Sequence, residues 1–337
     1  MADVARRAGV SGAAVSFALN DRPGVGEGTR ARILTVASEL GWRPSAGARA
    51  LSRSRASALG LVMSRPAELL AADPFFPQFI AGVESALADR GYAFLLQFVG
   101  NDENAEAECY RRLAQEGRVD GVLLTDLRTN ESRFELVRSL GIAALAVGLP
   151  RGDCPLPFVS LDDRPGVRAA VEHLVSLGHR RIAHVGGPRG YVHTASRRDA
   201  WRTAVKSAGL DPGPLVPGDF TGHSGAAATR ILLEAKERPT AIVYANDLMA
   251  IAGMGVASEY GLRIPDELSI VGFDDVLLAA HVVPPLTTVR PDVLTWGRVC
   301  ADTLLAVVEE RPLPTTQLEL PNLIVRGSTG PAPAKSI

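Results

Sequence analysis

The sequence predicts a small all-α domain followed by a larger α/β part that contains two doubly wound parallel sheets. Short helical patterns separated by Gly-containing turns occupy the first 41 residues. From residue 58 onward, short continuous apolar segments alternate with amphipathic helical ones, which is typical of parallel strands covered on both faces. The length of 337 residues favours more than one domain, since single cores seldom exceed about 250–300 residues.

The N-terminal helices are predicted from their ends as well as from their apolar faces. The first begins near Asp3 and ends at Gly9, and Ser11 is a suitable N-cap for the second. A turn at 20–24 leads to a third helix at 27–40. Two helices joined by a Gly-centred turn, with a third packed beneath, form a helix-turn-helix. A three-helix bundle that merely packs is the alternative.

Charge is distributed unevenly along the chain. Residues 1–57 carry nine arginines and four acidic residues, a net charge of +5, whereas the remainder carries −6. A basic head on an acidic body indicates that the head meets a polyanion such as DNA, although a solvated basic face would have the same composition. Residues 45–57 are rich in Ala, Arg and Ser, and we expect a linker that orders only against a partner.

The α/β part is predicted to hold two series of strands. The strands are 59–63, 94–99, 121–125 and 144–147, then 158–161, 182–185, 241–244 and 269–273. The helices between them are 78–90, 105–115, 167–177, 197–208, 225–237 and 248–260. Ligands bind such sheets at the carboxyl ends of strands, so we expect a small-molecule site in a cleft between two lobes.

No residue pattern selects an enzymatic reaction, so the sequence predicts a binding protein and not an enzyme. A nucleophile elbow, a phosphate-binding loop and a dinucleotide-binding glycine pattern are not found. Cys109, Cys154 and Cys300 lie far apart, and the histidines lack metal-ligand spacing, so we expect neither a metal nor another cofactor.

Two carboxylate pairs, Asp162-Asp163 and Asp274-Asp275, follow predicted strands. Such pairs can act as acid and base, accept hydrogen bonds from ligand hydroxyl groups, or cap helices. The opening residues show no secretory pattern, and no apolar run is long enough to cross a bilayer. We therefore expect a cytoplasmic protein without a membrane partner.

Motifs along nearly the whole chain point to a known family. In the head they are Asp3-Val-Ala-Arg-Arg-Ala-Gly-Val-Ser11, Val15-Ser16, Leu19-Asn20, Thr29-Arg30, Gly41-Trp-Arg-Pro44 and Ala48-Arg-Ala-Leu51. In the body they are Gly178-His-Arg-Arg-Ile-Ala183, Gly186-Gly-Pro188, Ala245-Asn-Asp247, Gly272-Phe-Asp-Asp275 and Pro285-Leu-Thr-Thr288. In this order and at this spacing, the set resembles the lactose-repressor (LacI/GalR) family of transcriptional regulators.

The resemblance implies a homodimer that binds a near-palindromic DNA operator and has a periplasmic-binding-protein-like sensor. The implied divisions are 1–44 (helix-turn-helix), 45–57 (hinge helix or linker), 58–327 (bilobal sensor) and 328–337 (flexible tail). Lobe one would take about 58–160 and 290–325, and lobe two about 161–288. The tail lacks leucine heptads, which favours a dimer over a tetramer.

The resemblance also places the second helix in the major groove of the operator. The DNA-binding residues it implies are Ser11, Gly12, Ala13, Ser16, Phe17, Asn20 and Arg30 in the head, and Ser45, Ala48, Arg49 and Leu51 in the linker. Because Gly12, Ala13 and Phe17 have no side-chain donors or acceptors, we expect readout by shape and by contact with thymine methyl groups. Leu51 resembles a leucine that enters the minor groove, and a partly buried core position is the alternative for Phe17.

The effector-binding residues implied by the resemblance are Phe75, Phe76, Arg197, Phe220, Asn246 and Asp274. Arg197 could bind a carboxylate or two hydroxyl groups, and Asp274 would accept hydrogen bonds from hydroxyl groups. The phenylalanines would form apolar walls, with lobe packing as the alternative for Phe76. Positions 291 and 293 are Pro and Val where the family often has Gln and an aromatic residue, so the effector of a relative does not transfer directly.

These expectations combine into a ligand-responsive repressor of carbohydrate-uptake or catabolic genes, released from its operator by a small sugar. A regulator with a non-sugar corepressor is the first alternative. A sugar-binding protein without DNA function is a second, which the basic helical head contradicts. A sugar-modifying enzyme is a third, for which no nucleophile or metal set is evident.

Overall fold

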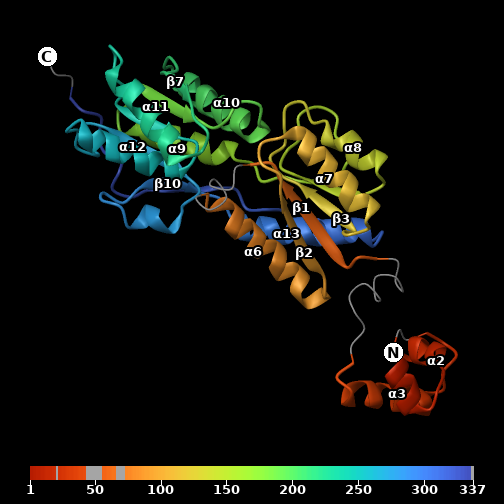
Figure 1. Cartoon of the computed structure of the whole chain (residues 1–337). Helices are drawn as coiled ribbons and strands as arrows, with labels where there is room; N and C mark the ends of the chain where they lie inside the picture. Colours follow the sequence, from red (N-terminus) through yellow and green to blue (C-terminus); the bar gives the residue numbers. More distant parts are fainter. Residues whose placement is uncertain (20–21, 43–54, 66–72, 335–337) are drawn as a thin grey trace. The chain divides into compact units, whose positions relative to one another are not determined.

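The computed structural model describes residues 1–19, 22–42, 55–65 and 73–334. The chain divides into two compact units, Met1–Ser57 with Gly117–Val119 and Ala58–Glu116 with Asp120–Ile337, and each unit is described by itself. Figure 1 shows the helical N-terminal unit in red and the α/β unit in the remaining colours. Among the described helices, none combines the length and hydrophobicity needed to cross a membrane.

The N-terminal unit consists of three helices, as the sequence predicts. They are α1 (Ala2–Ala8), α2 (Gly12–Leu19) and α3 (Glu27–Glu39). Gly9 ends α1 with φ +64°, a left-handed conformation that costs glycine little. The Ser11 hydroxyl accepts a hydrogen bond from the Ala14 N–H at 3.2 Å, which is the expected N-cap of α2.

A small apolar core joins the three helices. Its buried members are Val4, Ala8, Val15, Ala18, Ile33, Val36 and Ala37. Arg30 on α3 adds a polar link, because its guanidinium donates hydrogen bonds to the carbonyl oxygens of Ala18 at 3.3 Å and Arg22 at 2.6 Å. The end of α2 is therefore fixed against α3 by side-chain contacts as well as by packing.

The second unit contains two sheets, one in each lobe. The strands are β1 (Ala58–Met63), β2 (Ala93–Phe98), β3 (Gly121–Leu124), β4 (Ala143–Val147), β5 (Phe158–Val159), β6 (Ile182–Gly186), β7 (Leu215–Pro217), β8 (Ala241–Tyr244), β9 (Ser269–Phe273), β10 (Thr287–Arg290) and β11 (Asn322–Ile324). Lobe one has the order β2-β1-β3-β4-β5, and lobe two has the order β11-β10-β9-β8-β6-β7. All pairings are parallel except that of β10 with β11.

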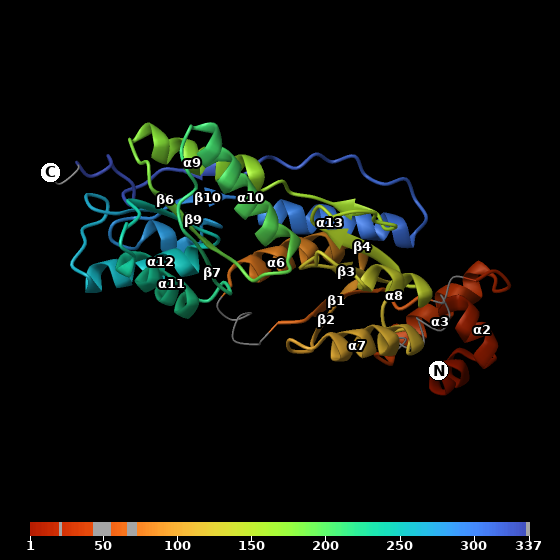
Figure 2. The ribbon, with the colours of Figure 1, turned by 90° about the horizontal axis from the view of Figure 1, so that it is seen from above.

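Helices cover both faces of each sheet (Figures 1 and 2). They are α6 (Phe75–Leu87), α7 (Glu103–Gln115), α8 (Arg133–Ser139), α9 (Arg164–Ser176), α10 (Val192–Ser207), α11 (Gly222–Glu234), α12 (Asp247–Glu259) and α13 (Val293–Val308), with short 3-10 helices at Ala88–Arg90 and Leu277–Ala280. The predicted class, a helix-turn-helix with two doubly wound lobes, is confirmed. The elements β7, β10, β11, α8 and α13 were not predicted from the sequence.

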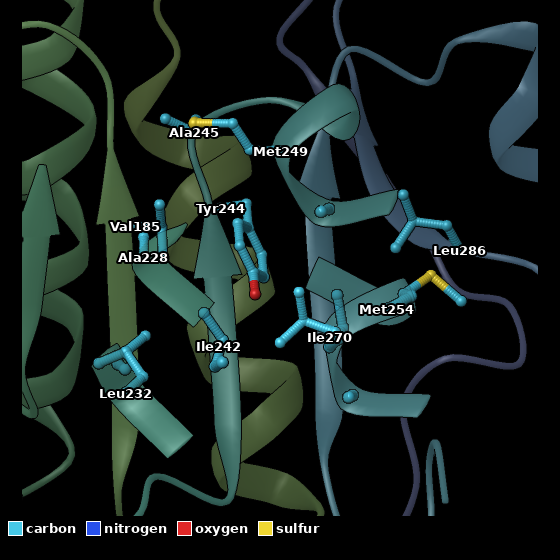
Figure 3. Packing of buried hydrophobic residues seen from close by; sticks show 14 of the residues in the cluster. Val185, Ala228, Leu232, Ile242, Tyr244, Ala245, Met249, Met254, Ile270 and Leu286 are labelled. Carbon is cyan, nitrogen blue, oxygen red and sulfur yellow. The ribbon is translucent and has the colours of Figure 1, made fainter. Parts of the chain in front are cut away.

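Successive side chains of a strand point to opposite faces of the sheet, so the lobe-two sheet has an apolar core on each face. On β8, Ile242 and Tyr244 belong to the cluster that contains residues of α11 and α12, whereas Ala241 and Val243 belong to the cluster with α9 and α10. Figure 3 shows Ile242 and Tyr244 among side chains of the first cluster. The Tyr244 hydroxyl is satisfied inside this core by the Thr229 hydroxyl at 2.7 Å.

The chain crosses between the lobes three times. It passes from β5 to α9, from β10 back to α13, and again from α13 to β11. α13 packs on lobe one through buried residues such as Cys300 and Leu304. We expected 290–325 in lobe one, but β11 pairs with β10 in the sheet of lobe two.

The predicted flexible tail beginning at residue 328 is also wrong for its first part. Ser328 is fully buried, and its hydroxyl donates to the Ile270 carbonyl oxygen at 2.6 Å. The Gly330 N–H donates to the Ser269 hydroxyl at 3.1 Å, and the Ala332 N–H donates to the Leu177 carbonyl oxygen at 2.8 Å. This segment extends the lobe-two structure through hydrogen bonds of its backbone and of serine hydroxyl groups, which the Pro- and Ala-rich composition does not reveal.

Two glycines let α6 and α13 approach closely. A Cβ atom on Gly82 of α6 would overlap the carbonyl oxygen of Leu294, and one on Gly297 of α13 would overlap the carbonyl oxygen of Phe79. The contact is therefore between helix backbones, which cannot move aside as a flexible side chain would. Besides this packing, α13 is held to lobe one by the Trp296 indole N–H, which donates to the Val159 carbonyl oxygen at 3.2 Å, and by the Arg90–Asp302 ion pair at 2.6 Å.

We predict that Gly82→Ala lowers the free energy of unfolding of the second unit by about 1–3 kcal/mol, because overpacking forces the helices apart. Gly255→Ala on α12 is the matched control, since its Cβ would meet nothing within 4 Å. That control should be neutral or stabilising by up to about 1 kcal/mol through helix propensity. Urea unfolding of both variants measures the difference, and equal stabilities would contradict the close-contact argument.

Candidate effector site and DNA-binding surface

A cavity of about 310 Å³ lies between the two lobes and is lined by residues of both. Several lining residues lie within two residues of a strand end, namely Arg65 after β1, Asp126 after β3, Asn246 after β8 and Asp274 after β9. The carboxyl ends of both sheets therefore face the cavity, which is the place where open parallel sheets bind ligands. We take this cavity as the candidate effector site.

Five of the six effector residues expected from the sequence line this cavity. They are Phe75, Arg197, Phe220, Asn246 and Asp274. Phe76 is not among the lining residues and is 1% exposed within the core of lobe one, so its assignment to the cavity wall is corrected to lobe packing. Neighbouring helix positions point in different directions, which explains why Phe75 reaches the cavity and Phe76 does not.

Arg65 forms a buried charged network that the sequence analysis missed. Its Nε and one terminal nitrogen each contact Asp126 at 2.6 Å, and its other terminal nitrogen contacts Asp73 at 3.1 Å. Burial opposes ionisation of both partners, but the bidentate pair outweighs it and holds the pKa of Asp126 below and that of Arg65 above their ordinary values. Its position two residues after a strand was the signal available in the sequence.

The same guanidinium also touches aromatic rings of both lobes. Its Cζ lies 5.0 Å from the ring centre of Phe76 in lobe one, and 5.6 and 5.5 Å from those of Tyr191 and Phe220 in lobe two. Cations at this distance are attracted to ring faces. Arg65 is therefore anchored by carboxylates of its own lobe and contacts the facing lobe through its flat surface.

Backbone hydrogen bonds connect the lobes beside this contact. The Thr129 N–H donates to the Gly190 carbonyl oxygen, and the Val192 N–H donates to the Leu127 carbonyl oxygen, both at 2.8 Å. They form an isolated antiparallel bridge between Arg128 and Tyr191. Opening the lobes at this edge would break these bonds together with the Arg65 ring contacts.

Arg197 is held by protein groups and not left open to the cavity. Its Nε donates to Asp163 at 2.7 Å, a terminal nitrogen donates to the Ala245 carbonyl oxygen at 2.6 Å, and its Cζ lies 3.6 Å from the Phe273 ring centre. Of the two roles considered for Arg197, a bidentate grip on a ligand carboxylate is therefore disfavoured. One terminal nitrogen is left to donate to a hydroxyl group.

Asp274 lies in a strained turn at the cavity wall and is buried. It has φ +112° and Asp275 has φ +51°, so two successive non-glycine residues adopt left-handed conformations after β9. Asp275 is paired with Arg290 and Arg326, whereas the Asp274 carboxyl group receives no hydrogen bond from any described residue. Burial raises the pKa of Asp274 well above its ordinary value, with Arg197 opposing this effect.

Asn246 has a structural role beside the cavity. Its side-chain oxygen accepts from the Met249 N–H at 3.0 Å and caps α12, while its amide nitrogen donates to the Phe220 carbonyl oxygen at 2.9 Å. The second amide hydrogen is available to a ligand. Asn246 also fixes the backbone of Phe220, an apolar wall of the cavity.

Aromatic side chains add to the cavity wall. His193 and Phe220 line the cavity and belong to a stack with Tyr191, in which ring centres lie 5.5 Å (Tyr191 to His193) and 5.6 Å (His193 to Phe220) apart. On the lobe-one side, Phe75 meets Trp296 of α13 edge to face at 5.8 Å. Trp296 was not predicted, because the family resemblance places the crossover aromatic residue at position 293, one helical turn earlier.

The DNA-binding residues expected on α2 lie on its outer face. Ser11, Gly12 and Ala13 are exposed, Ser16 is half-buried, and Phe17 is 38% exposed and outside the apolar core. Phe17 packs instead near Gly24, whose Cβ position lies 3.4 Å from its ring. Arg30 holds the end of α2, as described above, and so positions this surface.

Asn20, Ser45, Ala48, Arg49 and Leu51 lie outside the described residues. Within the described residues, no group of three or more His, Cys, Asp or Glu side chains is arranged to hold a metal ion. The cavity groups are side chains that donate and accept hydrogen bonds, and they define a binding site for a small polar molecule. Together with the exposed α2, they define the class of ligand-responsive helix-turn-helix regulators.

Comparisons with known proteins give the family. Residues 1–45 match the bacterial regulatory proteins of the lacI family, and residues 171–329 match a periplasmic binding protein-like domain. The chain is 35% identical to HTH-type transcriptional regulator reg1 of Streptomyces lividans, over 99% of this chain and 98% of the relative. It is 33% identical to the regulator CelR of Thermobifida fusca, over 96% of each. The chain therefore belongs to the LacI family of HTH-type transcriptional regulators.

Solved structures agree with this assignment. The complex of the regulator CelR with cellobiose has 32% sequence identity and a TM-score of 0.74, over 97% of this chain and 98% of that one. The lac repressor dimer bound to operator and an anti-inducer has 28% identity and a TM-score of 0.86, with the same coverage. The expected fold class and family are thus confirmed.

We predict that Arg65→Gln lowers the free energy of unfolding of the second unit by about 3–5 kcal/mol, because Asp73 and Asp126 lose their buried counter-ion. Arg151→Gln is the control, since Arg151 is exposed and lies 3.6 Å from Asp199 across the lobes, and it should change stability by less than about 1 kcal/mol. Chemical unfolding measures both. If the free energy of unfolding lost by the double variant Arg65→Gln/Asp126→Asn equalled the sum of the losses in the two single variants, Arg65 and Asp126 would not be coupled.

The pH dependence of stability should depend on His193. Burial lowers the pKa of His193 to about 3, with Asp126 opposing and Arg197 and Arg65 reinforcing this shift. The folded chain keeps His193 neutral, whereas in the unfolded chain His193 takes up a proton near its ordinary pKa of about 6.5. Acidification therefore favours the unfolded chain, and the folded chain loses stability as the pH falls from about 6.5 toward 3. We predict that His193→Phe reduces the loss of melting temperature between pH 7 and pH 4.5. The exposed His223→Phe variant is the control and should show the loss of the unmodified chain.

Proposed function

We propose that this regulator is a repressor of carbohydrate-uptake or catabolic genes, and that a small sugar bound in the interlobe cavity releases it from its operator. The observation that carries the proposal is the cavity itself, where aromatic walls and polar groups converge between two lobes of a DNA-binding protein. Sugars present apolar ring faces and several hydroxyl groups, which match such a lining. Relatives include ribose operon repressors and the cellobiose-bound CelR.

We infer that the operator is near-palindromic and that the regulator binds it as a homodimer, because a two-fold dimer presents two copies of α2 to successive major grooves. The lac repressor neighbour is a dimer bound to operator. A dimer also accounts for the exposed apolar residues at one edge of lobe two, where Leu277 and Val283 are 84% and 93% exposed.

Within this proposal the effector is bound and released unchanged, so the protein is not an enzyme, and it acts in the cytoplasm, where its operator lies. The residues we assign to the sugar are Phe75, Arg197, Phe220, Asn246 and Asp274, with Arg65 and Trp296 added from the cavity lining. The residues we assign to the operator are those of the exposed face of α2 and of the 45–51 linker. Sugar binding would shift the lobes between arrangements with different operator affinity, a coupling of typically about 1–3 kcal/mol.

The proposal is tested by measuring operator binding with and without sugars. A preferred duplex is first selected from random near-palindromic sequences with the full-length chain, and binding is followed by fluorescence anisotropy at fixed ionic strength. A neutral sugar, with cellobiose and ribose as the first probes, should weaken binding by about tenfold or more. A sugar that tightens binding would show that it acts as a corepressor and not as an inducer. If the chain bound the selected duplex no more tightly than random DNA, the proposed operator binding would be refuted.

We predict that Phe17→Ala weakens binding to the selected duplex by about tenfold, because an apolar contact to the groove is lost. Leu34→Ala is the control, since Leu34 is a similarly exposed apolar residue on α3 and should leave binding within about twofold. Thermal unfolding should show that both variants remain folded. An unchanged affinity of Phe17→Ala would remove Phe17 from the reading surface.

A further inference from the structure

Every arginine of the described cavity lining already has a carboxylate partner within the protein. Arg65 is paired with Asp126 and Asp73, and Arg197 is paired with Asp163. At the rim, Arg164 contacts Asp162 at 2.7 Å and Arg151 contacts Asp199 at 3.6 Å. No cation in this part of the lining is left to neutralise a charged ligand.

The acidic groups outnumber the basic ones. The described lining holds six carboxyl groups and four guanidinium groups. The sixth carboxyl group belongs to Asp274, which is 9% exposed and has no hydrogen bond from a described residue. In either protonation state Asp274 offers no positive charge, and its oxygens accept hydrogen bonds from hydroxyl groups.

Burial makes these ion pairs unfavourable to an anionic ligand. The side chains of Arg65, Asp163 and Arg197 are 6–11% exposed, so solvent screens their interactions much less than those at the rim. A phosphate or carboxylate entering the cavity would be desolvated beside an excess of carboxylates. It could gain a cation only by displacing an existing bidentate or charge-assisted pair.

We propose that the cavity selects an uncharged polyhydroxyl effector and rejects phosphorylated or carboxylated sugars, because Arg65 and Arg197 are internally neutralised. This inference rests on the proposed function and narrows its ligand class. It also assigns a specificity role to Asp163 and Asp126, which keep the two buried arginines from acting as anion sites. Neither carboxylate needs to touch the effector to have this role.

The first test needs no knowledge of the effector. Inorganic phosphate should not raise the melting temperature of the full-length chain above that in sodium chloride of equal ionic strength at pH 7. The double variant Asp163→Asn/Asp274→Asn replaces the two carboxyl groups beside Arg197 with neutral amides and should acquire a phosphate-dependent increase. The control double variant, Asp162→Asn/Asp199→Asn, makes the same two substitutions beside Arg164 and Arg151, which are more than half exposed, and should not.

Specific stabilisation of the unmodified chain by phosphate would overturn the inference, and so would equal responses of the two double variants. If Asp163→Asn/Asp274→Asn does not fold, Asp163→Ser takes its place, since serine also suits the N-cap position that Asp163 occupies at α9. The unmodified chain remains a test in any case.

The second test compares matched ligands by thermal stabilisation, which reports binding by mass action. The pairs are glucose with glucose 6-phosphate, ribose with ribose 5-phosphate, and cellobiose with cellobionate. Where the neutral member binds, its anionic partner should bind at least about tenfold more weakly. Tighter binding of any anionic member overturns the inference. Binding by no member counts against the proposed sugar effector, while the phosphate test still decides the charge selectivity.

Discussion

The effector site depends on the pairing of its buried arginines with carboxylate groups of the protein. A guanidinium group can remain inside a lobe only beside carboxylates, since an unpaired buried ion is very costly. Arg65 meets this requirement with Asp126, which follows β3, and with Asp73, which stands two residues before α6, and so connects these two segments to the end of β1. Arg197 meets it with Asp163 and the end of β8. The cavity wall is therefore fixed by its own ion pairs before any ligand is considered, which is the meaning of a preorganised site.

The two halves of the cavity are also connected to each other. Arg65 contacts Tyr191 and Phe220 across the lobes, and two backbone hydrogen bonds lie beside these contacts. A ligand that favours one separation of the lobes acts on all of these interactions at once, and it shifts the balance only by its difference in affinity for the two states. In the head, by contrast, Arg30 and the small apolar core hold α2 in place without any contribution from the cavity.

The sequence predicted most of the fold because strong local signals coincide with the elements. Gly9 and Ser11 have the conformations expected of a helix end and an N-cap, and the buried strands β8 and β9 begin and end where their apolar runs do. Elements with weak local signals were missed, such as the three-residue β7 and β11 and the seven-residue α8, which depend on contacts with neighbouring elements for stability.

For the site, family motifs led to Arg197, Asn246 and Asp274. Arg65 follows a predicted strand but stands in none of the family motifs, and Trp296 reaches the cavity through the packing of α13, which no local pattern encodes. The prediction that Phe76 lines the cavity was wrong for a related reason. Phe75 and Phe76 are adjacent in the sequence, and only the folded helix decides which of them faces the cavity.

The three crossovers have a consequence for how such regulators can be recombined. Neither lobe is a continuous stretch of polypeptide, because lobe one takes α13 from the C-terminal part of the chain and lobe two takes β11 from beyond it. A gene fusion with a single junction inside the sensor would therefore leave one lobe without a helix or a strand. Exchange of ligand preference between relatives is structurally simplest when the whole sensor moves as one cassette, joined to a different reading head near residue 58.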